Sequence, residues 1–332
     1  MSDRTPEARL VKSTTVRAQL AVAAVRTGLR AAHWLPGDLG PTWAGRLFST
    51  PRRHPRPARE RALLASAQPL GLDVVLGAPA HRGEVVRLAA WRWGRGPTVL
   101  LVHGWEGRGA QLGAVVEPLV DAGLSVLTFD APAHGDSPGD RLILADLADA
   151  VRAAARAAGE LHGIVAHSFG ALATTLALAR GVDAARVAYL APATVIHSAT
   201  ASFARFVGLA PGEVERLHRR MTELNGFAPD DALPERLGPR IEPPLLVVHD
   251  RDDDEVPFDD ARRLAAAVPG SRLVATVGLG HRRILRDPAV IAGAVQFVAA
   301  GAHVAAPDPT RRPFVDAWVA PIQAERLVAS LR

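Results

Sequence analysis

From about residue 70 onward, the chain alternates short apolar runs, rich in Val and Leu, with longer stretches of helical periodicity. Each apolar run has the length of a buried strand. The stretch 141–159, RLILADLADAVRAAARAAG, shows the helical pattern and ends on a glycine, as helices often do. Strands that alternate with helices predict a mostly parallel sheet covered on both faces. The predicted strands are GLDVVL (71–76), EVVRLAAWRW (84–93), PTVLLVHG (97–104), LSVLTFDAP (124–132), LHGIVAHS (161–168), ARVAYLAP (185–192), PPLLVVHD (243–250) and SRLVATVG (271–278).

One insertion interrupts this alternation. Residues 197–240 contain no convincing strand and predict two or three short helices, which would form a lid over the carboxyl edge of the sheet. The chain therefore divides into an α/β core at 70–196 and 241–301, the helical lid at 197–240, and two flanking segments at 1–69 and 302–332. The second flanking segment closes with a further predicted helix.

The first flanking segment begins with a predicted amphipathic helix over 16–35. Its apolar arc is broad and its polar stripe narrow, which favours docking on the protein; the alternative is a helix lying on a membrane surface. Its uncharged run, AQLAVAAV, is far too short to cross a bilayer. The next stretch, STPRRHPRPARER (49–61), predicts a connector held extended by prolines, with arginines that face solvent rather than form a binding patch.

Composition narrows the class of protein. The 332 residues, 48% of them hydrophobic, suffice for a soluble globular protein with a sizeable core. A net charge of +5 is small for this length and no nucleic-acid-binding motif accompanies it, so we expect no nucleic-acid partner. The absence of cysteine excludes disulfides and cysteine nucleophiles, and it suits a cytoplasmic protein. The 12 histidines show no metal-ligand spacing, so we expect neither a metal nor another cofactor.

Ligands of open α/β sheets bind at the carboxyl ends of the strands, and Ser168 stands at such an end within AHSFGA (166–171). It ends one predicted strand and begins an alanine-rich helix, whose first amides favour developing negative charge. Ala166 and Gly170 flank it, where a tight strand-to-helix turn leaves little room for side chains. The pattern predicts a nucleophilic serine; the alternative is a small residue at the end of a strand.

A nucleophilic serine needs a base, and the base needs an acid. His281 follows the last predicted strand in the glycine-containing loop GLGHRR. The stretch HDRDDDEVP (249–257) follows another strand and offers five acidic side chains. We reject a calcium loop of the EF-hand type, because Glu255 and Ala261 occupy the positions of its turn glycine and its last glutamate. The sequence thus supplies a serine, a base and several candidate acids.

The reaction also requires an oxyanion site. Gly104, Gly107 and Gly109 allow close backbone approach in the loop after the strand at 97–104. We expect the backbone amides of Trp105 and Phe169 to be the donor pair. The apolar side chains of the predicted lid indicate either an acyl pocket or the lid's own core. The residues expected to contact substrate are His103, Gly104, His167, Phe203 and Phe206, and the further apolar lid residues are Leu209, Met221 and Phe227.

Over roughly residues 70–301, these motifs resemble the α/β-hydrolase family. The resemblance is carried by HGW (103–105), FDAPAHGDSPG (129–139), AHSFG (166–170), HDRDDDEVP (249–257) and GLGH (278–281). Serine, aspartate and histidine occur in the order that this family uses. The resemblance implies an α/β-hydrolase fold, with a mostly parallel eight-stranded sheet, helices on both faces and a small helical lid, and it places the triad acid at Asp253. The chain departs from the pattern at Ala166 and Asp250, where the family usually has glycine.

The leading prediction is a serine hydrolase that cleaves a carboxylic ester through an acyl-enzyme intermediate. An acyltransferase or a thioesterase could use the same triad. A non-catalytic binding scaffold is a third alternative, although it would have no need of all three residues. Haloalkane dehalogenases and epoxide hydrolases share the fold but use an aspartate nucleophile, which Ser168 replaces here. The fold does not select a substrate, so the expected partner is a small-molecule ester.

Overall fold

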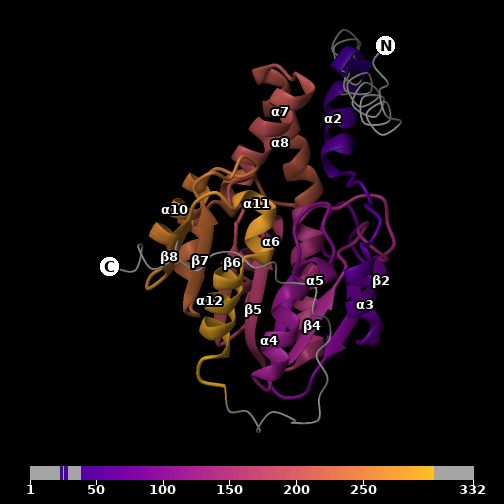
Figure 1. Ribbon diagram of the computed structural model, residues 1–332. Coiled ribbons are helices and arrows are strands. Elements are labelled where there is room, and N and C mark those ends of the chain that lie inside the picture. The colour runs from indigo at the N-terminus through magenta and orange to yellow at the C-terminus, as the bar shows by residue number, and fades with distance from the viewer. Residues whose placement is uncertain (1–22, 25, 29–38, 303–332) are drawn as a thin grey trace, which may run out of the picture.

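The computed structural model describes residues 23–24, 26–28 and 39–302 (Figure 1). Its eight-stranded sheet has the order β1-β2-β4-β3-β5-β6-β7-β8. The pairs β1–β2 and β2–β4 are antiparallel, and every other pair is parallel. The predicted mostly parallel, eight-stranded sheet is therefore confirmed. The strands are β1 (Gln68–Val75), β2 (Val85–Trp93), β3 (Thr98–Val102), β4 (Ser125–Phe129), β5 (Leu161–His167), β6 (Arg186–Leu190), β7 (Leu245–Asp250) and β8 (Arg272–Thr276).

Helices cover both faces of the sheet, as Figure 1 shows. The central strand β3 is buried along its whole length: Leu100 and Val102 enter one hydrophobic cluster, and Val99 and Leu101 enter the other. Side chains that alternate between two cores explain why this strand is apolar at every position from 99 to 102. The first cluster is covered by α5 (Leu144–Ala158), α6 (Phe169–Leu178) and α10 (Phe258–Ala267), and the second by α3 (Ala58–Ala65), the 3₁₀ turn η1 (Gly109–Val115), α4 (Val116–Asp121) and α12 (Pro288–Ala299).

Between β6 and β7 the described chain is entirely helical or irregular. Figure 1 shows α7 and α8 rising beyond one end of the sheet, together with α2 (Leu39–Ser49). Ala44 of α2 packs with Val207 of α7 in a small separate cluster. This segment thus packs against α2 as well as against the core. Its elements are α7 (Ile196–Val207), α8 (Pro211–Asn225), η2 (Pro229–Ala232), α9 (Pro234–Leu237) and η3 (Gly238–Arg240).

The predicted N-terminal helix over 16–35 lies mostly outside the described residues. Within the described part, Arg26 donates from Nη2 to the carbonyl of Phe206 at 2.7 Å, which links this segment to α7. Docking of the whole helix remains a prediction. The helix expected in the tail after residue 302 also lies outside the described residues. Among the helices that are described, none combines the length and the apolar character that a membrane span requires.

The proline- and arginine-rich connector differs from the prediction, because its arginines bind the core rather than solvent alone. Arg53 donates to the carbonyls of Gly135 at 2.6 Å and Ser137 at 2.7 Å. Arg56 pairs with Asp130 and Asp136, and its guanidinium lies 5.2 Å from the ring centre of Trp91. The Arg56 side chain is only 14% exposed, so this ion pair is largely buried. Two connector arginines therefore hold the turn after β4.

Replacing Arg56 with alanine should lower the free energy of unfolding by about 3 kcal/mol, because Asp130 stays buried without its cation. Urea denaturation measures this change. Arg236→Ala is the matched control: Arg236 pairs with Asp231 at 2.7 Å but is 61% exposed. An exposed pair contributes about 1 kcal/mol or less. Equally small losses in both variants would contradict a structural role for Arg56.

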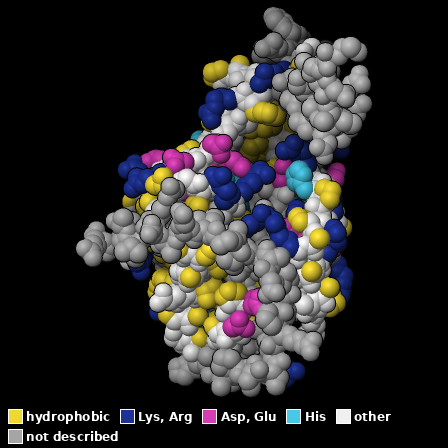
Figure 2. Space-filling model, in the orientation of Figure 1, with side chains coloured by type: hydrophobic (Ala, Val, Ile, Leu, Met, Phe, Trp, Pro, Cys, Tyr) yellow, Lys and Arg dark blue, Asp and Glu magenta, His cyan; other side chains and the backbone are white. Residues whose placement is uncertain are grey.

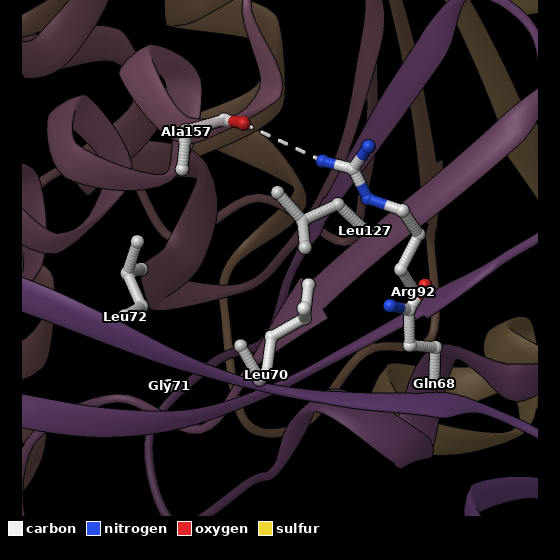
Figure 3. A pocket seen from close by; sticks show the side chains of 8 residues that line it. Gln68, Leu70, Gly71, Leu72, Arg92, Leu127 and Ala157 are labelled. Carbon is white, nitrogen blue, oxygen red and sulfur yellow. Dashed lines mark hydrogen bonds between the residues drawn. The ribbon is translucent and has the colours of Figure 1, made fainter.

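A cavity of about 250 Å³ opens beside the antiparallel edge of the sheet (Figure 3). Leu70 and Leu127 lie beside it, and Arg92 reaches the carbonyl of Ala157 at 3.4 Å. None of the predicted site residues lines this cavity. It also has no carboxylate, histidine or serine in its wall, so it offers no acid–base or nucleophilic chemistry. The lining residues are Gln68, Leu70, Gly71, Leu72, Ala90, Arg92, Leu127 and Ala157.

Candidate active site

Ser168 occupies a sharp turn between β5 and α6. Its backbone has φ +52° and ψ −126°, a conformation that costs free energy for any residue with a side chain. The turn is tightly enclosed: a Cβ on Gly170 would lie 2.4 Å from the carbonyl oxygen of His103, and one on Gly104 would lie 2.7 Å from Ser168 Cβ. Ala166, by contrast, lies inside β5 and pairs regularly with Val102, so glycine is not needed there. These contacts explain the pattern around the serine.

The structure brings Ser168, His281 and Asp253 together in one hydrogen-bonded chain. His281 Nε2 lies 2.9 Å from Ser168 Oγ, and His281 Nδ1 lies 2.7 Å from Asp253 Oδ2. His281 stands in the single helical turn α11 (Gly280–Arg283) rather than in the predicted loop, and it is 6% exposed. The three side chains come from segments that follow β5, β7 and β8, so the parallel sheet delivers them to one edge.

The Asp253 carboxylate is enclosed and fully engaged. Oδ1 accepts from the backbone amides of Glu255 and Val256, each at 2.9 Å, and Oδ2 faces His281. Burial acts to raise the pKa of Asp253, but hydrogen bonds from His249, His281 and the Val256 amide hold that pKa well below its usual range. The carboxylate is therefore charged whenever His281 needs a negative partner.

Asp250, one of the alternative acids, has a different place. It is fully buried and accepts from Thr276 Oγ1 at 2.6 Å and from the Leu279 amide at 3.0 Å through Oδ2. Its Oδ1 accepts from the Asp252 amide at 3.0 Å. Asp250 thus joins the ends of β7 and β8 and shapes the loop that carries the triad acid. Asp254, on the same loop, is exposed.

The two amides predicted to hold an oxyanion lie on loops that meet at Ser168. Phe169 is the first residue of α6, and Trp105 follows Gly104, which abuts the serine. Their rings pack edge to face, with centroids 6.2 Å apart. Neither amide donates a hydrogen bond to another group in the described part of the chain. Both donors are thus available to a ligand.

The loop after β3 is held in a strained conformation by contacts that the sequence did not predict. Glu106, next to Trp105, has φ +54°, which is unfavourable for a residue other than glycine. Its amide donates to His134 Nε2 at 3.0 Å. Its carboxylate accepts from the side chain of Arg52 at 2.8 and 3.0 Å and lies 3.4 Å from His54. The connector therefore fixes the residue beside the Trp105 amide.

Two of the residues predicted to contact substrate instead support the site from behind. His103 is 1% exposed; its Nδ1 donates to the Gly104 carbonyl at 2.8 Å, and its Nε2 accepts from the Ala131 amide at 2.9 Å. Burial lowers the pKa of His103 to about 4 and that of His167 to about 3. His167 donates from Nε2 to the carbonyl of His281 at 3.1 Å. Both ring nitrogens of His103 are therefore engaged within the protein, and His167 is held through Nε2.

The two lid phenylalanines predicted to contact substrate have different surroundings. Phe203 packs edge to face against Phe48 of α2, with ring centroids 5.2 Å apart. Phe206 is 58% exposed and offers its carbonyl to Arg26. Phe203 and Leu209 belong to the cluster that joins α7 to α2, while Met221 and Phe227 pack against the main core. Phe203, Leu209, Met221 and Phe227 therefore serve packing, whereas the side chain of Phe206 is exposed.

A polar cavity of about 220 Å³ lies beside the site. Figure 2 shows arginine side chains gathered across the middle of this face, near a histidine and below the projecting helices. Glu106, which follows Trp105, and Arg282, which follows His281, contribute to its wall. Two of its arginines are neutralised locally: Arg108 pairs with buried Glu60, and Arg282 pairs with Glu255 at 2.7 Å. The lining residues are His54, Glu106, Arg108, Gln111, Arg282, Leu285 and Arg286.

Comparison with known proteins identifies the family. The profile of the alpha/beta hydrolase family matches residues 99–294, more than half of the chain, and the protein therefore belongs to that family. The α/β-hydrolase fold implied by the sequence motifs is confirmed. Within the described residues no cluster of three His, Cys, Asp or Glu side chains could hold a metal ion.

Several relatives and solved structures are similar to this chain. An uncharacterized protein of Mycobacterium tuberculosis is 29% identical over 269 residues, which cover 76% of this chain and 84% of that protein. A Pyrococcus furiosus esterase superposes with a TM-score of 0.51 at 19% identity, covering 72% of this chain and 91% of the esterase. The esterase Est1E of Butyrivibrio proteoclasticus, solved with ferulic acid, gives a TM-score of 0.52 at 20% identity. The match covers 64% of this chain and 96% of Est1E. At such identities, these structures establish a shared fold.

Proposed function

We propose that the protein is a serine hydrolase that cleaves a carboxylic ester through an acyl-enzyme intermediate. The observation that carries the proposal is the hydrogen-bonded chain from Ser168 Oγ to His281 Nε2 (2.9 Å) and from His281 Nδ1 to Asp253 Oδ2 (2.7 Å). The esterase folds among the similar structures support the same reaction class. The absence of cysteine supports a cytoplasmic setting, which we include in the proposal.

In the acylation step, Ser168 Oγ attacks the carbonyl carbon of the ester while its proton passes to His281 Nε2. Asp253 holds the Nδ1 proton of His281, which keeps Nε2 free as the base and stabilises the imidazolium that forms. The carbonyl oxygen becomes an oxyanion and accepts from the amides of Trp105 and Phe169. His281 then returns the proton to the departing alcohol as the carbon–oxygen bond breaks.

Deacylation reverses these roles. Water attacks the acyl carbon, gives a proton to His281 Nε2, and forms a second oxyanion at the same two amides. Collapse of this intermediate returns the proton from His281 to Ser168 Oγ and releases the carboxylic acid. The turn at Ser168, with its positive φ, presents Oγ to the base His281 at 2.9 Å.

A substrate panel tests the reaction class. The wild-type protein should hydrolyse p-nitrophenyl esters, with a rate that depends on acyl length, and should cleave matched amides far more slowly. Matched thioesters, with and without an added alcohol acceptor, separate an esterase from a thioesterase or an acyltransferase using the same triad. Failure to turn over any ester, thioester or amide in the panel would contradict the proposal.

A further inference from the structure

The triad acid has a second imidazole neighbour. His249, the next-to-last residue of β7, is fully buried, and its Nε2 lies 3.2 Å from Asp253 Oδ2 and 3.1 Å from the carbonyl of Val256. The same Asp253 oxygen lies 2.7 Å from His281 Nδ1. One carboxylate oxygen is therefore shared by two histidine rings.

The contacts of His249 fix which nitrogen carries its proton. Both atoms that face Nε2 are acceptors, so Nε2 must be the donor. Nδ1 is buried and has no hydrogen-bond partner among the described residues. The ring packs edge to face against Phe258, with centroids 5.8 Å apart at 84°. Turning the ring over would place a carbon atom against both oxygens, so the Nε2 proton of His249 is shared between the Val256 carbonyl (3.1 Å) and Asp253 Oδ2 (3.2 Å).

The contact of His249 with Asp253 Oδ2 affects how strongly Asp253 attracts the proton of His281. Each hydrogen bond that stabilises the carboxylate makes it a weaker base, and a weaker base attracts the Nδ1 proton of His281 less strongly. The imidazolium form of His281 is then less stabilised. His281 consequently loses its proton, and becomes able to accept one from Ser168, at a lower pH than it would without His249.

We propose that His249 is a positioning residue of the active site: it fixes the Asp253 carboxylate and sets the pH at which His281 acts as a base. This inference rests on the proposed serine hydrolase function. His249 has no exposed surface, so it contacts no substrate and acts only through Asp253.

Two other titratable groups lie close to this cluster. The ring of His167 on β5 is tilted against that of His281, with centroids 4.8 Å apart. Asp260 on α10 interacts electrostatically with His249 and accepts from the Val195 amide and Ser198 Oγ at 3.2 and 2.9 Å. Both groups are the same in wild type and in the His249 variants, so the comparison of variants reports the loss of the Nε2 donor, which faces Asp253 and the Val256 carbonyl.

The test compares pH profiles of kcat/KM for wild type, His249→Phe and His249→Gln on one ester. Phenylalanine keeps a ring but removes the donor, whereas glutamine places an amide donor near the position of Nε2. We expect the acidic limb of the Phe variant to move to higher pH by about half to one unit, with KM little changed, and the Gln variant to restore most of the wild-type profile. Active-site titration with an organophosphonate corrects each rate for the fraction of folded enzyme.

If His249 served packing alone, His249→Phe would lower the fraction of active enzyme but leave the acidic limb of the kcat/KM profile at the wild-type pH. That result would overturn the inference. If wild type neither cleaves esters nor reacts with the phosphonate, the proposed function itself fails. A nuclear magnetic resonance spectrum of histidine-¹⁵N-labelled wild type gives an answer that does not depend on how the variants fold. We expect a protonated Nε2 in His249, and an Nδ1-protonated tautomer would equally overturn the inference.

Discussion

Replacing Ser168 with alanine is expected to lower ester turnover by about a million-fold, because the nucleophile of a triad that acts as a unit cannot be replaced by its partners. The fold should be unchanged, since alanine removes only Oγ from a serine whose backbone is held by β5 and α6. Stopped and continuous ester assays measure the loss, and circular dichroism checks the fold. Ser202→Ala, in α7, is the control for the effect of losing a serine hydroxyl elsewhere. A folded Ser168→Ala variant with turnover within tenfold of wild type would show that the nucleophile lies elsewhere.

Replacing Asp253 with asparagine is expected to lower turnover by roughly ten-thousand-fold, the loss known for the equivalent change in a serine protease triad. The amide group would donate toward His281 Nδ1 and favour the tautomer with its proton on Nε2. That nitrogen faces Ser168 Oγ and could no longer accept its proton. The expected effect is on kcat rather than on folding.

Two neighbouring acids supply the controls for this change. Asp254→Asn, on the exposed part of the same loop, should retain nearly full turnover. Asp250→Asn should chiefly lower stability, because Asp250 is a buried acceptor for Thr276, Leu279 and Asp252. A deep loss of turnover in a stably folded Asp250→Asn variant, with Asp253→Asn nearly active, would assign the triad acid to Asp250 instead.

The sheet could be predicted from the sequence because each strand has a local signature. Strands such as β3 are buried on both faces and read as continuous apolar runs, and the helices between them keep a clear periodicity. Ser168 and His281 could also be singled out, because Ser168 ends one predicted strand, His281 lies in the loop after another, and parallel strands bring such ends together.

Contacts between distant segments could not be predicted in this way. Arg52 and Glu106 are 54 positions apart, and Arg56 and Asp130 are 74 apart, so no local pattern links them. Arginines in a proline-rich stretch most often face solvent, and the prediction followed that tendency. The lid phenylalanine Phe203 likewise looked like a substrate contact, because its partner on α2 lies far away in the sequence.

The role of His249 was not predicted, although His249 belongs to a stretch that the sequence analysis singled out for its acidic residues. It lies four residues before Asp253 in the quoted stretch HDRDDDEVP, at the end of a buried strand. A histidine at such a position can turn either toward the acid or into the core, and only the fold shows that Nε2 faces Asp253. The choice depends on how the loop 250–256 returns past the end of β7, which spacing alone does not specify.

The central claim is that Ser168 is a nucleophile activated by His281, and covalent labelling tests it most directly. Wild-type protein is treated with a fluorophosphonate, digested, and analysed by mass spectrometry, with Ser168→Ala treated in parallel. We predict a phosphonyl adduct on Ser168 in the wild type, no adduct in the alanine variant, and strongly slowed labelling in His281→Gln, because the base that activates the serine is gone. An adduct on another residue, or labelling that persists in Ser168→Ala, would contradict the assignment.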